Sequence, residues 1–235
     1  MSNQTILYYE RTAAEYDSLH GEDLNLEHTN ALERTWPLLK NMDVSSVTDV
    51  GCGTGRALGW YQRHIPGAHL TGVEPSASML QIARERVPGA EFIIGTGESL
   101  PLPSGYADLV VATGILHHAD DPAGIIGEMF RVARKAVLIS DHNNFSFGST
   151  FMRWTRLRLY ACQLLGVACF VKQGFKKQGY TKEDGWWYPY SLLADYGVIA
   201  RRAREAFIVP TQPVNSNDFS NLLMCQSHLA ILAYK

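Results

Sequence analysis

The sequence predicts an α/β domain with a Rossmann-like, doubly wound sheet of seven strands, helices on both faces and a helical cap. Short apolar runs alternate with amphipathic segments between residues 45 and 142, as in parallel sheets with crossover helices. Three alternate glycines follow the first run in VTDVGCGTGRALGW (47–60), and such a turn joins a strand to a helix. The second apolar run ends in an acidic residue, Glu74.

Length and composition set limits on function. A chain of 235 residues fits one domain, 1–235, with a lid or cap. Its formal net charge of −2 provides no basic field for nucleic acid. The four cysteines lack metal-ligand spacing, so we expect free thiols and a cytoplasmic protein. No secretion signal or membrane-spanning run is present, which leaves peripheral membrane contact open and says nothing about oligomeric state.

We expect two helices at the N-terminus, over residues 5–18 and 26–40, the second with Asn25 as its N-cap. The first helix has an unusual density of rings and acids for a solvent-exposed helix. These residues are Tyr8, Tyr9, Glu10, Tyr16 and Asp17. The rings either pack the helix onto the domain or contact a ligand.

The alternating region predicts a strand at 45–50, a helix at 55–64, a strand at 69–74, a helix at 76–87 capped by Ser76, and a strand at 91–94. A fourth strand lies within 107–118, where Leu109 to Val111 suit burial on both faces. A helix at 122–133 with Asp121 as N-cap and a fifth strand within 135–144 follow. Two further strands are expected at 204–210 and 228–235.

The spacing of the glycine turn discriminates between two ligand classes. A dinucleotide site has G-x-G-x-x-G or A, but Arg56 occupies that third position here. Asp49 precedes the glycines by two residues, and a carboxylate suits a cationic amine or sulfonium better than a pyrophosphate. The turn also predicts a row of exposed amide N–H groups at a helix N-terminus. Glu74, 19 residues past Gly55, is placed to accept hydrogen bonds from both ribose hydroxyls of a nucleoside.

Four motifs in order support a family resemblance. VTDVGCGTG (47–55), LTGVEPS (70–76) and GTGESLPLPSGYADLVVATGILHHADDP (95–122) resemble the first four motifs of class I S-adenosylmethionine-dependent methyltransferases. The chain looks most like the methyltransferase-11-like branch that includes the ubiquinone/menaquinone C-methyltransferases. The resemblance covers about residues 8 to 142, and it points to S-adenosyl-L-methionine as the cofactor while saying little about the acceptor.

The resemblance implies a strand order of 3-2-1-4-5-7-6 with the last strand antiparallel, and an N-terminal lid over 1–40 that closes on the cofactor. It also implies a set of cofactor-binding residues. These are Tyr16, Asp49, Gly51, Cys52, Gly53, Gly55, Glu74, Pro75, Met79, Thr96, Gly97, Glu98 and Thr113. Relatives often have an acidic residue where Thr96 stands, so its hydroxyl would give the adenine amino group a neutral contact.

Candidates for proton transfer lie at strand ends. His117 and His118 follow the fourth strand, and Asp141 and His142 follow the fifth. The carboxyl ends of parallel strands are where open α/β sheets bind ligands, and histidine is the usual acid/base residue. We interpret these four residues as the catalytic candidates.

Residues 145–190 are interpreted as a helical and aromatic cap inserted in the domain. The run 151–170 is apolar, and its arginines at 153, 156 and 158 scatter around a helix, which does not favour a membrane-surface helix. Trp186, Trp187, Tyr188 and Tyr190 either wall an acceptor pocket or pack the cap onto the core.

The sequence therefore predicts methyl transfer by in-line displacement to a small-molecule acceptor: a sugar, phenol, quinone or lipid-linked intermediate. Two alternatives stay open. One is a metal-assisted O-methyltransferase using Asp141 and Asn143 or Asn144, with Asp120 or Asp218 as a second carboxylate. The other is a non-catalytic S-adenosylmethionine-binding module. No bound metal is expected in the favoured interpretation, and no G-x-S-x-G elbow supports a hydrolase.

Overall fold

The computed structural model describes residues 3–19, 26–146, 148–172, 178–182, 185–212 and 227–235. Two helices, α1 (Asn3–Leu19) and α2 (Leu26–Leu39), come first. The alternating region follows as β1 (Ser46–Val50), α3 (Arg56–His64), β2 (His69–Glu74), α4 (Ala77–Arg86), β3 (Glu91–Ile94), β4 (Ala107–Thr113), α5 (Pro122–Val132) and β5 (Ala133–His142). These bounds confirm the predicted elements to within a few residues. Asn25, the expected cap of α2, lies outside the described residues.

The second half of the chain is less regular. After β5 come α6 (Thr150–Ala161), α7 (Leu165–Lys172), β6 (Gly179–Thr181), β7 (Gly185–Trp187), α8 (Tyr196–Ala200), β8 (Glu205–Pro210) and β9 (His228–Tyr234). Single 3₁₀ turns, η1 (Leu116–His118), η2 (Asn144–Ser146) and η3 (Leu192–Asp195), lie between them. The β6–β7 pair was not predicted, because two strands of three residues are too short to show a period of two.

Among the described residues, seven strands form one sheet in the order β3-β2-β1-β4-β5-β9-β8. The first five strands of this order are parallel, and β9 is antiparallel to both of its neighbours, β5 and β8. The predicted order and the antiparallel last strand are therefore confirmed. β1 and β4 lie side by side at the centre, so the chain reverses direction across the sheet there, and ligands bind at such a switch point.

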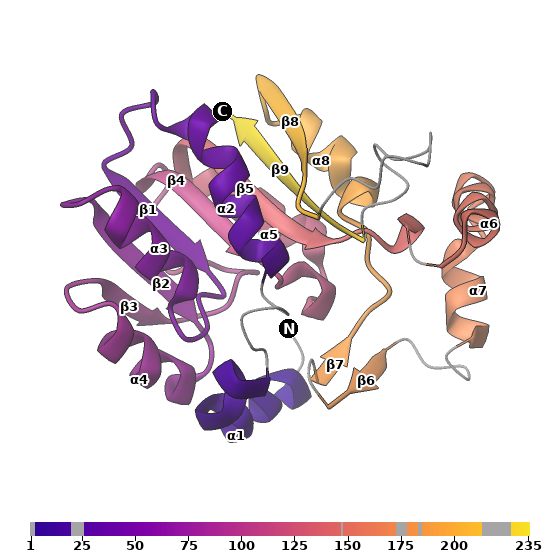
Figure 1. Ribbon diagram of the computed structural model, residues 1–235, viewed down its shortest axis with the longest axis horizontal. Helices are drawn as coiled ribbons and strands as arrows, with labels where there is room; N and C mark the ends of the chain where they lie inside the picture. The colour runs from indigo at the N-terminus through magenta and orange to yellow at the C-terminus, as the bar shows by residue number, and fades with distance from the viewer. Residues whose placement is uncertain (1–2, 20–25, 147, 173–177, 183–184, 213–226) are drawn as a thin grey trace.

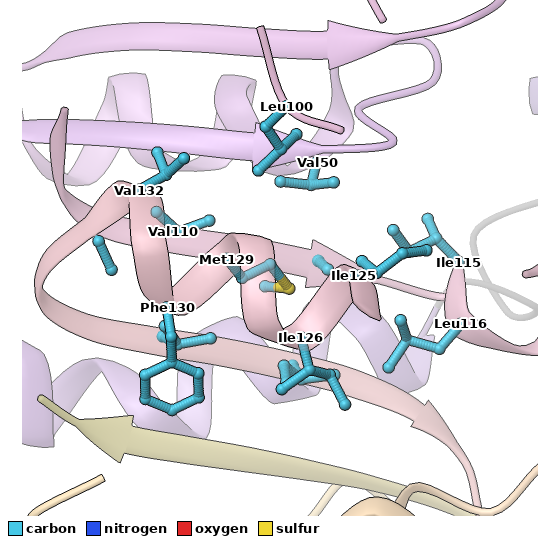
Figure 2. Packing of buried hydrophobic residues seen from close by; sticks show 14 of the residues in the cluster. Val50, Leu100, Val110, Ile115, Leu116, Ile125, Ile126, Met129, Phe130 and Val132 are labelled. Carbon is cyan, nitrogen blue, oxygen red and sulfur yellow. The ribbon is translucent and has the colours of Figure 1, made fainter. Parts of the chain in front are cut away.

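Both faces of the sheet are covered. Leu109 and Val111 of β4 pack with α2 and α3 on one face, and Val110 packs with α5 on the other. Figure 2 shows this second cluster, in which Ile125 and Met129 of α5 lie over β4. All five of these side chains are buried, which confirms the prediction that β4 is a strand buried on both faces.

Two predicted helix caps are present. The Ser76 hydroxyl accepts a hydrogen bond from the Met79 N–H at 3.2 Å, and an Asp121 carboxylate oxygen accepts one from the Gly124 N–H at 3.0 Å. Each satisfies a backbone donor that the first helical turn leaves open. Together they fix where α4 and α5 begin, directly after the strand-end residues of the candidate site.

Helix α1 packs on α4 below the sheet (Figure 1). At the start of α4, the Glu10 carboxylate accepts hydrogen bonds from the N–H groups of Ala77 at 2.6 Å and Ser78 at 3.3 Å. At its end, Asp17 forms an ion pair with Arg86. The two helices therefore run in the same direction, and α1 is held at both ends of α4. The acids that made the first helix unusual in sequence serve this attachment.

The glycine turn between β1 and α3 requires its glycines. Gly51, Gly53 and Gly55 have φ values of 68°, 52° and 80°, which side chains other than glycine adopt only at a cost. A Cβ on Gly51 would lie 2.5 Å from Cγ2 of Ile115. The turn thus depends on glycine for both its conformation and its contact with the segment after β4.

We predict that Gly51→Ala lowers the free energy of unfolding by about 2–4 kcal/mol, because it adds overpacking to the strain of a left-handed φ. Gly89→Ala is the matched control, since Gly89 has φ 90° and a Cβ there would meet nothing within 4 Å. Urea denaturation of both variants measures the difference. Equal losses would show that the contact with Ile115 is unimportant.

Candidate cofactor and acceptor site

Glu74, the last residue of β2, is fixed beside the glycine turn. Its Oε2 accepts a hydrogen bond from the Gly53 N–H at 3.1 Å, and its Oε1 accepts one from the Ser76 N–H at 3.0 Å. The side chain is buried. Burial raises the pKa of Glu74 to about 7, although both backbone hydrogen bonds oppose this shift.

The turn was expected to expose a row of N–H groups. This prediction is wrong for four residues, whose N–H groups donate hydrogen bonds within the protein. The N–H groups of Gly51 and Cys52 donate to the Val73 carbonyl at 2.8 and 3.2 Å, and that of Gly55 donates to the Cys52 carbonyl at 2.8 Å. The Gly53 N–H is taken by Glu74. Because β2 accepts hydrogen bonds from most of these N–H groups, the turn offers a ligand the Glu74 carboxylate rather than these amide donors. This favours a cationic group over a phosphate.

Asp49 adds a second buried carboxylate. It lies in β1 and is 1% exposed, and its Oδ1 has no hydrogen-bond partner among the described residues. Burial raises the pKa of Asp49 to about 8; the Arg56 guanidinium lowers it, and Glu74 raises it further. A buried carboxyl oxygen without a partner is costly unless a ligand uses it. The pair of Asp49 and Glu74 fits a ligand with a positive charge and hydroxyl groups.

Gly53 is the open point of the turn. A Cβ on this residue would meet nothing within 4 Å, whereas a Cβ on Gly51 would contact Ile115 and one on Gly55 would contact Ala83. The open space therefore lies where the Glu74 carboxylate meets the turn.

The other predicted cofactor residues differ in their burial. Thr96, Gly97 and Glu98 are half-buried after β3, and Thr96 pairs with Ser99 in an isolated bridge. A Cβ on Gly97 would lie 3.1 Å from Ile125. Cys52 and Met79 are buried, while Tyr16, Pro75 and Thr113 are half-buried. The Cys52 sulfur packs against β2, 2.6 Å from where a Cβ on Gly72 would stand. Contacts of these residues with a cofactor stay predictions.

His118 joins two parts of the structure. Its Nδ1 donates to the Trp186 carbonyl at 2.7 Å, because a carbonyl only accepts. In the neutral ring, Nε2 then accepts from the Tyr9 hydroxyl at 2.9 Å. His118 thus links α1 to β7 through η1, which is a structural task. The geometry does not support His118 as a general base.

His117 and Asp141 form a buried pair, 3% and 0% exposed. The Nδ1 of His117 lies 2.8 Å from Oδ1 of Asp141, and Asp141 also accepts hydrogen bonds from the N–H groups of Leu116 and His142, each at 2.7 Å. Burial would raise the pKa of Asp141, but His117, His142 and these hydrogen bonds hold it well below its usual range. The pair fixes the His117 ring with Nδ1 toward the carboxylate.

His142 is the predicted candidate that reaches a cavity. The ring centroids of His117 and His142 are 4.1 Å apart. His142 lines a cavity of about 440 Å³. The other lining residues are Asn144, Arg156, Cys169, Lys172, Thr181, Trp187, Tyr188, Pro189 and Tyr190. The volume and the aromatic walls are those of a small-molecule site.

Within the part of the chain that the structure describes, Asn143 and Asp120, two of the oxygen ligands considered for magnesium, already have protein partners. Asn143 is buried, with Oδ1 accepting from the Ser191 hydroxyl at 3.0 Å and Nδ2 donating to Ser146 at 2.9 Å. Asp120 accepts a hydrogen bond from the Tyr188 hydroxyl. Asp218 lies outside the described residues. His117, Asp141 and His142 do offer ligand atoms within 4.8 Å of one another. Asp141 already accepts three hydrogen bonds, which leaves it a poor ligand.

Two histidines of this region were missed from the sequence. His228 of β9 lies 4.4 Å from His142 between ring centroids, and His28 of α2 lies 5.3 Å from His228. His28 also contacts the Ser140 hydroxyl at 3.2 Å. Neither residue carries a local motif, since they reach the site only through the antiparallel pairing of β9 with β5 and the packing of α2. Burial and neighbouring positive groups hold the pKa of His28 well below its usual value.

Part of the chain is similar to known methyltransferases. Residues 48–139 match the family described as a methyltransferase domain. The chain is 37% identical over 105 residues to trans-aconitate 2-methyltransferase of Paracidovorax citrulli, covering 42% of this chain and 40% of that protein. It is 27% identical over 127 residues to demethylmenaquinone methyltransferase of Thermotoga maritima, covering 54% and 56%. The chain spans only about half the length of these curated relatives, or less.

Solved structures share the fold. An S-adenosylmethionine-dependent methyltransferase from Thermotoga maritima aligns with a TM-score of 0.60 at 21% identity, over 98% of this chain and 99% of that one. One from Aquifex aeolicus aligns with a TM-score of 0.57 at 14% identity, over 94% and 97%. The match over residues 48–139 and the shared fold support the resemblance to class I S-adenosylmethionine-dependent methyltransferases that the four motifs indicated. S-adenosylmethionine is the cofactor that this class implies, and the acidic pair at the glycine turn fits it.

The raised pKa values predict a pH dependence. Below pH 7 Glu74 and Asp49 hold protons, and a cationic ligand requires both to be ionised, so binding releases protons. We expect the affinity for S-adenosylmethionine to rise at least about tenfold from pH 6 to pH 9. Calorimetry in buffers of different ionisation enthalpy measures the proton release directly.

The matched variant is Glu74→Gln, which removes the titration near pH 7 and leaves that of Asp49. Its affinity should be lower throughout and rise only toward pH 8. An affinity independent of pH in the native protein would rule out ionisation of this pair on binding.

Proposed function

We propose that the protein transfers a methyl group from S-adenosylmethionine to a small-molecule acceptor held in the cavity beside His142. The proposal depends on the two buried carboxylates, Asp49 and Glu74, beside a turn whose backbone conformation favours glycine. When bound, S-adenosylmethionine supplies an electrophilic methyl group that an acceptor takes by in-line displacement. The chain's own residues then have to bind, orient and exclude water.

Glu74 is the candidate for the ribose hydroxyls. Its two oxygens are already oriented by Gly53 and Ser76, so little side-chain freedom is lost on binding. Asp49, with an oxygen that no described residue uses, is the candidate for the positive end of the ligand. Thr96 and Gly97 are the candidates for the adenine.

Helix α1 is proposed as the lid of this site. It is fixed to α4 through Glu10 and Asp17 and to η1 through the Tyr9 hydroxyl on His118. The Asp17 carboxylate also accepts a hydrogen bond from Thr54 of the glycine turn at 3.0 Å. The helix thus bridges the glycine turn and the histidines, where a lid would exclude water from methyl transfer.

The acceptor cavity supports a planar substrate. Trp187, Tyr188 and Tyr190 line it together with His142, and aromatic walls stack on flat rings. One relative is named for trans-aconitate and another for demethylmenaquinone, a conjugated acid and a quinone. We propose a phenol, quinone or conjugated acid as the acceptor, ahead of a sugar.

His142 is proposed as the general base. It is the one of the four catalytic candidates that lines the cavity. His117 and Asp141 are buried behind it, and their hydrogen bonds hold the ring beside it. They are therefore positioning residues.

The described cysteines, Cys52, Cys162 and Cys169, are free thiols, which supports a reducing compartment such as the cytoplasm.

We predict that Glu74→Ala weakens S-adenosylmethionine binding about 10- to 100-fold, because two hydrogen bonds to a charged group are lost. Isothermal calorimetry measures this. Glu91→Ala, a change at a half-exposed carboxylate on β3, is the control and should bind as the native protein does. Native affinity in the Glu74 variant would refute the proposed nucleoside site.

We predict that His142→Gln lowers kcat about 100- to 10,000-fold for a hydroxyl or carbon-acid acceptor, with S-adenosylmethionine affinity unchanged. His69→Gln, at the far end of β2 from Glu74, is the control. Candidate phenols, quinones and conjugated acids are screened with radiolabelled cofactor. A variant with native kcat and a native pH profile would remove His142 from proton transfer.

A further inference from the structure

Helices α6 and α7 expose an unusual amount of apolar surface. Thirteen large apolar side chains of the described residues are exposed, and eight of them lie between residues 151 and 171. These are Phe151, Met152, Trp154, Tyr160, Leu164, Val167, Phe170 and Val171. Phe151 is 76% exposed and Val167 is 59% exposed. A concentration of this kind on one supersecondary unit marks an interaction surface.

The exposed residues follow the helical repeat. On α6, Phe151, Trp154 and Arg158 are spaced i, i+3, i+7 and are all exposed. On α7 and the residue before it, Leu164, Val167 and Val171 have the same spacing and are also exposed. Each helix therefore presents an outward stripe, which is apolar on α7 and consists of two aromatic rings and an arginine on α6. The scatter of the three arginines around α6 did not indicate these stripes, because most of their members are apolar.

The charge around these helices is one-sided. Residues 142–182 contain seven of the 21 lysine and arginine residues of the chain and none of its 23 acidic residues. The rest of the chain is therefore acidic, with 14 basic and 23 acidic residues. Phenyl, indole and aliphatic groups interspersed with cations are the composition of segments that bind anionic lipid surfaces.

The two helices stand at the edge of the molecule (Figure 1). They are attached to the body near η2, where Arg156 donates to the Asn144 carbonyl at 2.7 Å and the rings of Phe145 and Tyr160 lie 4.8 Å apart. The acceptor cavity is lined from both helices, by Arg156 of α6 and by Cys169 and Lys172 of α7. The exposed stripes and the cavity thus belong to the same unit.

We propose that α6 and α7, residues 150–172, form a docking hairpin that inserts its apolar stripes into the headgroup region of an anionic membrane. The exposed Arg158 of α6 and Lys172 of α7 would pair with lipid phosphates. A second copy of the chain fits less well, because a twofold contact would bring the two basic segments together. No described helix is long and apolar enough to cross a bilayer, so docking is peripheral. If the proposed function holds, docking also brings the cavity to the membrane, where an amphipathic acceptor resides.

The test is flotation of the full chain with vesicles of phosphatidylcholine alone or mixed with phosphatidylglycerol, at low and high salt. We expect retention on the mixed vesicles, weaker retention without the anionic lipid, and loss at high salt. The double variant Phe151→Ser/Val167→Ser should lower the partition coefficient at least about tenfold, since each buried apolar side chain contributes strongly. The matched control is Leu7→Ser/Tyr196→Ser, which removes exposed apolar groups elsewhere.

Brominated lipid supplies a second measurement. Trp154 is 39% exposed on the α6 stripe, so bromine on the acyl chains should quench native fluorescence more than that of Trp154→Phe. Calorimetry with S-adenosylmethionine on the same variants separates this proposal from the proposed function, because cofactor binding should be unchanged. The proposal is overturned if mixed vesicles retain no protein, if the stripe variant floats like the native chain, or if sedimentation shows a dimer that the stripe variant dissociates.

Discussion

Two buried carboxylates at neighbouring strand ends are the constraint on which the site depends. Asp49 and Glu74 lie on neighbouring strands because β1 and β2 are parallel and adjacent, with Asp49 opposite Gly72, two residues before Glu74. Gly72 has to be glycine for a related reason, since a Cβ there would lie 2.6 Å from the Cys52 sulfur and 2.8 Å from Phe92. Gly72 therefore leaves room for the Cys52 side chain of the turn and for the Phe92 ring of β3. Burying acids costs stability unless a ligand compensates them.

In the histidine region, a single carboxylate holds several groups in place. Asp141 accepts hydrogen bonds from His117, Leu116 and the His142 N–H, so one carboxylate orders the ends of β4 and β5 together. The rings of His117, His142, His228 and His28 then follow one another through the interior. In this arrangement the proposed proton transfer and structural support are divided among histidines that look alike in sequence. His142 lines the cavity, and His118 hydrogen-bonds to Tyr9 of α1, the proposed lid helix.

Much of the fold was predictable, because its signals are local. The glycine turn, the caps at Ser76 and Asp121 and the apolar run at 109–111 each follow from a few adjacent residues. The strand order came from the family resemblance and is confirmed. The cavity was not predictable in detail, because it combines Arg156, Lys172 and Trp187 from elements that meet only in the tertiary structure. The prediction of exposed amide groups in the turn failed for the same reason. The Val73 carbonyl that accepts hydrogen bonds from two of these groups belongs to the next strand.

We infer that the acidic glycine turn selects a cationic nucleoside over a pyrophosphate cofactor. Competition calorimetry with S-adenosylmethionine and NADH measures this selection on the native chain. We expect S-adenosylmethionine to bind and NADH neither to bind nor to displace it. Displacement of S-adenosylmethionine by NADH, or binding of NADH alone, would show that the turn accepts a pyrophosphate instead.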